Sequence, residues 1–155
     1  MLIIKYLFFS ISLTFLSWII AMLTSPIMVK SKFHQEYLSN LNFIKSDVIN
    51  KIIGIGIIKW IVINTFFKNF NPKLKLNGEI SFSNLNLLRK EMTKSEIDHL
   101  IGFAYIMIFV FIKIFSQEYL FGLVMLVINI LMNLYPSLLQ QHNKRRIDRL
   151  RSKYF

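Results

Sequence analysis

The stretch Leu120–Arg146, LFGLVMLVINILMNLYPSLLQQHNKRR, decides the fold of this chain. It begins as an apolar run, Leu120–Leu139, and ends in a polar and basic string. Polar residues inside the run recur at steps of 4, 4 and 3, which place them on one helical face. Hydrocarbon tolerates such groups only where they meet partners or line a cavity. The stretch therefore predicts a polar site at a membrane boundary, built on Asn129, Asn133, Ser137 and Gln140.

The composition is that of an integral membrane protein. Of the 155 residues, 54% are hydrophobic and 15% are aromatic, in a chain too short for more than one domain. The absence of cysteine excludes disulfides, thiolate metal sites and a cysteine nucleophile. The formal charge is +11, but the basic residues lie beside apolar runs and no nucleic-acid-binding motif is present. We therefore expect anionic lipid headgroups, and no nucleic acid, as the counter-charge.

Four apolar segments organise residues 1–155 as a single membrane domain. Residues 2–23 have the length of a transmembrane helix, and Lys5 lies near the end, where it can snorkel to the headgroups. A cleaved signal peptide is the alternative, although residues 21–23 lack a small-x-small cleavage pattern. Residues 52–67 are short for a span and contain Lys59 beside Trp60, a pair typical of a headgroup anchor. This second segment is expected to be interfacial or re-entrant.

The last two apolar segments predict a C-terminal helical hairpin, residues 94–115 and 120–142, followed by a basic cytoplasmic tail, residues 143–155. The match of Thr93 to Glu96 with a capping box predicts that the first arm begins at Lys94. The preceding residues 69–86 are rich in Asn, Ser, Gly and Pro and are expected to form a loop.

Lysine and arginine counts orient the spans. The tail after residue 143 has six in ten residues, the segment 68–99 has another six, and the hairpin turn has none. Both basic segments are therefore expected to face the cytoplasm. Three spans would also place the loop of residues 30–51 inside, whereas four would place it outside. The expected fold class is an all-α integral membrane protein with three, alternatively four, transmembrane helices.

The polar cluster before the third apolar segment offers a candidate catalytic pair. Glu96 and His99 are three residues apart and share a helical face, so the carboxylate can orient the imidazole and raise its basicity. The alternative is that both are solvated groups of a first helical turn, where acids are favoured. A single Glu-x-x-His pair does not make a di-iron site, and no spacing of His34 or His142 supports a metal. We expect this cluster to meet the polar end of Leu120–Arg146.

Two motifs in this order resemble those of the glycosyl-4,4'-diaponeurosporenoate acyltransferases, membrane proteins of the staphyloxanthin-type carotenoid pathway. The first is Lys94–Leu100, KSEIDHL, similar to the family's Arg-x-Glu-x-x-His-Trp. The second is Asn133–Arg146, NLYPSLLQQHNKRR, similar to Asn-x-Pro-x-x-x-x-Gln-Arg-Tyr-Asn-Arg-x-Arg. The chain departs from these motifs at Gln141, His142 and Leu100 and in the place of its proline, as a divergent member would. The positions that match are Glu96, His99, Asn133, Gln140, Asn143 and Arg146, and Lys144 keeps the charge.

The resemblance implies a membrane acyltransferase of the cell membrane that moves a fatty acyl group from a thioester donor to a hydroxyl of a glycosylated lipid or carotenoid. Glu96 and His99 would be the catalytic pair, with His99 as the base. Amides of Asn133, Gln140 or Asn143 would hold the oxyanion, and Lys144 and Arg146 would bind donor phosphate. No cofactor or metal is expected.

A non-enzymatic scaffold is the competing class. In that case the polar face on Asn129 and Asn133 would be a helix-packing seam, and the basic tail would only set the topology. The Glu96–His99 pair discriminates between the two, because a seam does not need it.

Overall fold

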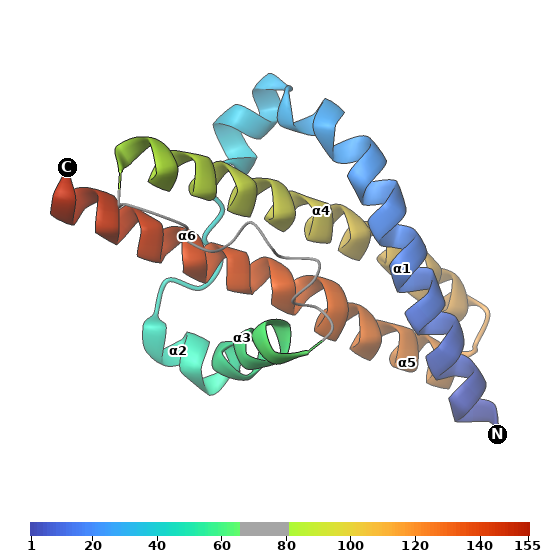
Figure 1. Cartoon of the computed structure of the whole chain (residues 1–155). Helices are drawn as coiled ribbons and strands as arrows, with labels where there is room; N and C mark the ends of the chain where they lie inside the picture. The colour runs from blue at the N-terminus through green and yellow to red at the C-terminus, as the bar shows by residue number, and fades with distance from the viewer. Residues whose placement is uncertain (66–80) are drawn as a thin grey trace.

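The computed structural model describes residues 1–65 and 81–155, and over these residues it is helical without strands. The described residues contain six α-helices and two π-helical turns. Helix α6 continues α5 through the second of these turns (Figure 1). The elements are α1 (Leu2–Val29), η1 (His34–Leu38), α2 (Asp47–Ile52), α3 (Ile55–Asn64), α4 (Phe82–Phe115), α5 (Tyr119–Asn129), η4 (Ile130–Leu134) and α6 (Tyr135–Tyr154).

Three helices in the described residues are long and apolar enough to cross a membrane: Leu2–Val29, Phe82–Phe115 and the continuous helix Tyr119–Tyr154. This confirms the expected all-α membrane fold with three spans. Helix α3 has only 10 residues, which is shorter than a span. The connection between α4 and α5 is short, as predicted for the hairpin turn.

Helix α4 begins at Phe82, so the predicted start at Lys94 is wrong. The Ser81 side chain accepts a hydrogen bond from the backbone N–H of Asn84 at 3.1 Å and caps this earlier start. Thr93 lies inside the helix, where its hydroxyl donates to the carbonyl of Arg89 at 3.0 Å instead of capping. The predicted loop at residues 69–86 is therefore helical from Phe82 onward, and its part up to residue 80 lies outside the described residues.

The predicted basic tail, residues 143–155, is the second half of α6 rather than a separate segment. It remains helical because it has an apolar face to bury: Ile147 packs against Leu85, Leu88 and Met92 on the first half of α4. The Phe82 and Phe155 rings meet at 5.6 Å, so the C-terminus lies beside the start of α4 (Figure 1). The first half of α4 and the second half of α6 are therefore the paired, more polar ends of these two long helices.

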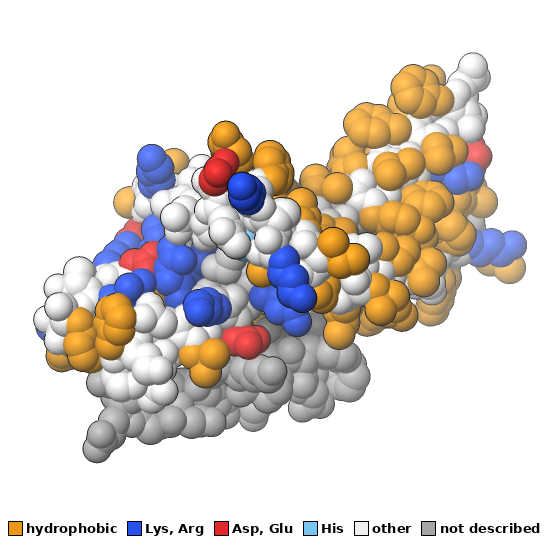
Figure 2. Space-filling view, turned by 90° about the horizontal axis from the view of Figure 1, so that it is seen from above, with side chains coloured by type: hydrophobic (Ala, Val, Ile, Leu, Met, Phe, Trp, Pro, Cys, Tyr) orange, Lys and Arg blue, Asp and Glu red, His pale blue; other side chains and the backbone are white. Residues whose placement is uncertain are grey.

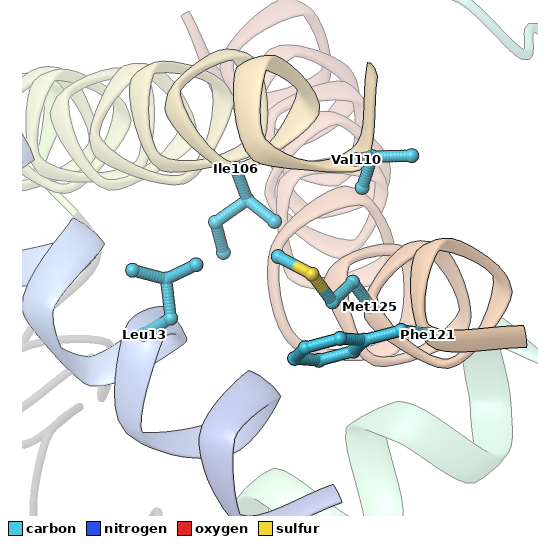
Figure 3. Packing of buried hydrophobic residues seen from close by; sticks show 5 residues of the cluster. All are labelled: Leu13, Ile106, Val110, Phe121 and Met125. Atoms are coloured by element: carbon cyan, nitrogen blue, oxygen red, sulfur yellow. The ribbon is translucent and has the colours of Figure 1, made fainter. Parts of the chain in front are cut away.

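Side chains of different character cover the two ends of the molecule. Figure 2 shows hydrophobic side chains gathered over one end and most of the visible Lys and Arg side chains over the other. Inside the apolar end, residues of α1, α4 and α5 form one core, drawn in Figure 3. These residues are Leu13, Ile106, Val110, Phe121 and Met125. The boundary between the two ends is where a functional site is expected.

A π-helical turn lies on this boundary. The N–H of Tyr135 donates to the carbonyl of Ile130, five residues back, and Pro136 follows directly. Proline has no N–H to donate, so it cannot complete the α-helical ladder at this point. The turn carries Asn133, which is fully buried.

Helix α1 approaches α4 closely because both helices present small residues. The buried face of α1 is formed by Ser10, Leu13, Thr14, Ser17, Ala21 and Ser25. On α4, a Cβ added to Gly102 would lie 3.0 Å from Asn133 Oδ1 and 3.1 Å from Ser17 Oγ. Gly102 is therefore the point where α1, α4 and η4 come together.

We predict that Gly102→Val destabilises the protein by about 1–3 kcal/mol, because its side chain overpacks this junction. The matched control is Gly56→Val in α3, where an added Cβ meets nothing within 4 Å. Thermal unfolding of both variants in detergent measures the difference. An equal decrease in Tm for the two variants would contradict the close approach at Gly102.

Candidate active site

The two predicted polar clusters meet between α4 and the C-terminal helix, as the sequence indicated. Glu96 Oε2 forms an ion pair with Lys144 Nζ. Gln140 Nε2 donates weakly to Ser95 Oγ at 3.4 Å. Further along, Arg89 Nε donates to Asp148 Oδ1 at 2.8 Å. The antiparallel pairing of α4 with α6 brings these residues together, because they are about 50 residues apart in the chain.

The Glu96–Lys144 pair is almost completely removed from solvent. Glu96 is 0% exposed and Lys144 is 3% exposed. Lys144 Nζ also lies 3.4 Å from the backbone carbonyl of Ser39. Neither charge can be withdrawn from water without a partner, so each requires the other. In this structure Lys144, predicted to bind phosphate, faces Glu96 instead of solvent.

A chain of side-chain hydrogen bonds joins the three spans. Trp18 Nε1 on α1 donates to Asn133 Oδ1 at 2.8 Å. Asn133 Nδ2 donates to Asn129 Oδ1 at 2.9 Å, and Asn129 Nδ2 donates to the carbonyl of Phe103 on α4 at 3.1 Å. Both asparagines are 0% exposed. The predicted polar face of the helix is therefore buried and provides contacts between helices.

His99 lies next to this chain and is partly buried. Its ring is 5.9 Å from the Trp18 ring at an interplanar angle of 85°, an edge-to-face contact. Asn133 is a polar neighbour of the same ring. His99 Nδ1 is buried and has no hydrogen-bond partner within the described residues. Glu96, one helical turn earlier, faces Lys144, so the proposed orientation of His99 by Glu96 stays a prediction.

The remaining predicted site residues differ in their accessibility. Gln140 is buried, and its Oε1 has no hydrogen-bond partner in the described part of the chain. Asn143 is partly buried, whereas Arg146 is exposed and has no ion pair among residues 1–65 and 81–155. Of the two predicted cations, Arg146 is thus the one available to an incoming ligand.

The segment between α1 and α2 closes the polar side of the site. The Phe43 N–H donates to Gln141 Oε1 at 2.8 Å, and Arg145 donates to the carbonyl of Ile44. Arg149 donates to Asp47 Oδ2 at 2.8 Å, and this hydrogen bond holds the pKa of the Asp47 carboxyl below its usual value. This segment, residues 39–47, thereby anchors α2 on α6.

Sequence reasoning missed two residues of this region. Trp18 lies in an apolar run where no pattern distinguishes it from a lipid-facing residue. His34, in η1, is 5% exposed, and both its ring nitrogens lack hydrogen-bond partners in the described residues. Burial, and then the Lys144 charge, lower the pKa of His34 below its usual value.

No group of three or more His, Cys, Asp or Glu side chains in the described residues could hold a metal ion.

Fold and site together define a helical membrane protein with three spans, a histidine at the boundary of its apolar and polar ends, and an adjoining buried ion pair. The chain belongs to the glycosyl-4,4'-diaponeurosporenoate acyltransferase family, whose match covers residues 29–153. This confirms the resemblance seen in the two motifs and supports an acyltransferase of a carotenoid pathway. No curated protein and no solved structure matches the chain.

We predict that Lys144→Met destabilises the protein by about 3–5 kcal/mol, because it leaves the Glu96 charge buried without a partner. The double variant Glu96→Gln/Lys144→Met should recover most of this loss, since no unpaired charge then remains. Thermal unfolding in detergent measures both variants.

The control for the ion pair is Glu118→Gln. It breaks the 2.9 Å pair between Lys113 and Glu118, whose side chains are 27% and 43% exposed, and should cost only about 0.2–1 kcal/mol. A double variant no more stable than Lys144→Met would refute the role of the buried pair.

Proposed function

We propose that this protein transfers a fatty acyl group from a thioester donor to a hydroxyl of a glycosylated lipid or carotenoid. The observation that carries the proposal is the place of His99. His99, whose Nδ1 has no hydrogen-bond partner in the described residues, lies beside Asn133 and one helical turn from the buried Glu96–Lys144 pair, where a lipid-bound hydroxyl and a polar donor would meet. The family match supports this class of reaction.

In this mechanism His99 takes the proton of the acceptor hydroxyl as its oxygen attacks the thioester carbonyl. The carbonyl π electrons move to oxygen and form an oxyanion. When the oxyanion collapses, the carbon–sulfur bond breaks, and His99 returns the proton to the departing thiolate. The products are an ester on the acceptor and a free thiol, so the imidazole ends neutral as it began.

The oxyanion requires hydrogen-bond donors that are not already used. The Asn133 side chain is already hydrogen-bonded to Trp18 and Asn129. We therefore propose that Asn133 positions His99 and does not bind the oxyanion. Gln140 makes only the 3.4 Å contact with Ser95, and Asn143 has no side-chain hydrogen bond with described residues. We therefore assign the oxyanion to the amides of Gln140 and Asn143.

Donor phosphate is assigned to Arg146, because a guanidinium binds phosphate oxygens in pairs and this side chain is exposed. Lys144 forms an ion pair with Glu96, so its role is to neutralise the buried Glu96 carboxylate. Glu96 lies one helical turn from His99, and we assign to its carboxylate the task of favouring a transient imidazolium.

The substrate orientation follows from the distribution of side chains. Lipid chains of the acceptor would lie against the apolar end, and the soluble donor would approach from the basic end. We place this basic end, with the C-terminus, in the cytoplasm by the excess of Lys and Arg, and we expect it to contact anionic lipid headgroups.

The test is mass spectrometry of lipids and pigments from cells that supply glycosylated terpenoids and acyl donors. The wild-type chain should yield an acylated glycoside, which His99→Ala should reduce by about 10²- to 10⁴-fold. Asn143→Ala should also reduce it. The matched control is His142→Gln, a histidine near Asp47 rather than the reacting groups, which should leave the product intact at equal membrane levels.

Unchanged product with His99→Ala would remove His99 as the base. Absence of any product from the wild-type chain in such a host would favour a second function, a membrane scaffold. The chain of hydrogen bonds from Trp18 through Asn133 and Asn129 to Phe103 supports that alternative, because it already joins three helices.

A further inference from the structure

The hydrogen-bond chain between the spans ends on α1 at an indole whose ring also touches His99. Trp18 Nε1 is 2.8 Å from Asn133 Oδ1, and the Trp18 ring lies 5.9 Å from the His99 ring at 85°. One side chain thus contacts both the proposed base and the amide beside it. The family match begins at residue 29, the last residue of α1, so it does not cover Trp18.

The Asn133 amide has its orientation set by two directed bonds. Its oxygen accepts from Trp18, and its nitrogen donates to Asn129 at 2.9 Å. A flip of the amide would place N–H against N–H at Trp18 and oxygen against oxygen at Asn129. Because Asn133 is 0% exposed, no water can compensate for such a mismatch.

We propose that Trp18 is a positioning residue of the active site: its indole N–H sets the Asn133 amide, and the amide and the indole ring together set the orientation and tautomer of His99. The inference rests on the proposed role of His99 as base. It assigns to α1, which supplies none of the predicted site residues, an indirect part in the reaction, through the orientation of Asn133 and His99.

Geometry explains why an aromatic donor is required at this position. Helix α1 contacts α4 through small residues, and at Gly102 an added Cβ would crowd the side chains of Asn133 and Ser17, at 3.0 and 3.1 Å. A planar side chain with one N–H can contact the imidazole with its ring and the amide with its edge. Phenylalanine can keep the first contact and cannot make the second.

The first measurement is NMR of the protein in detergent with ¹³C,¹⁵N-labelled histidine. Its three histidines can be assigned with His34→Gln and His142→Gln. Trp18→Phe should shift the ¹⁵N resonances of His99 toward a different tautomer ratio. The control is Trp60→Phe, the other tryptophan, which is 63% exposed on α3 and should leave His99 unchanged. Unchanged His99 resonances in Trp18→Phe would overturn the inference.

The second measurement is steady-state acyl transfer. Trp18→Phe should lower kcat on the order of 10- to 100-fold, with KM for donor and acceptor unchanged, because Trp18 orients the base and binds neither substrate. Phe8 lies on the same helix and is 70% exposed, so Phe8→Leu should leave kcat unchanged. In the double variant Trp18→Phe/Asn133→Ala the loss should equal that of Asn133→Ala alone. Additive losses, or an unchanged kcat in Trp18→Phe, would overturn the positioning role.

Two provisions keep the test decisive. If Trp18→Phe does not fold, benzothienylalanine at residue 18 in a Trp60→Phe background replaces the N–H with sulfur and retains the ring shape. If the wild-type chain transfers no acyl group, the proposed function fails, and the His99 resonances alone then support or overturn the contact of Trp18 with the base.

Discussion

The buried ion pair between Glu96 and Lys144 is the interaction on which the arrangement of this protein depends. It joins α4 to α6 where the apolar end gives way to the charged end. Two opposite charges without solvent are tolerated only in contact, so the pair sets the register of the two long helices. From this register follow the Arg89–Asp148 pair and the burial of Ile147 against the first half of α4.

Within the spans, hydrogen bonds between uncharged side chains join the helices. Hydrophobic burial does not hold helices together in lipid, so close packing and interhelical hydrogen bonds must do so. Small residues on α1 and Gly102 on α4 permit the close packing, and Asn129 and Asn133 supply the hydrogen bonds. Asn133 is also a polar neighbour of His99. The same side chains can therefore stabilise the packing of the helices and support a reactive histidine.

The two classes of function considered for this chain differ in what they require of the boundary region. A scaffold needs the asparagine seam alone. An acyltransferase also needs an imidazole with a free nitrogen, amide donors for the oxyanion and an accessible cation, roles that we propose for His99, for Gln140 with Asn143, and for Arg146. The family match and this combination both favour the enzyme.

The sequence by itself determined the membrane class, the polar helix face and the two motifs, because these depend on composition and on periodicity along one helix. It left three and four spans open, and the short helix α3 in the structure favours three. It misplaced the start of α4, since a capping box at Thr93 looks the same within a helix as at its end. Only the tertiary structure decided that Lys144 faces Glu96 and that Trp18 reaches His99 and Asn133. These contacts join residues far apart in the chain, and their partners depend on how the helices pack, which no local pattern of a single sequence contains.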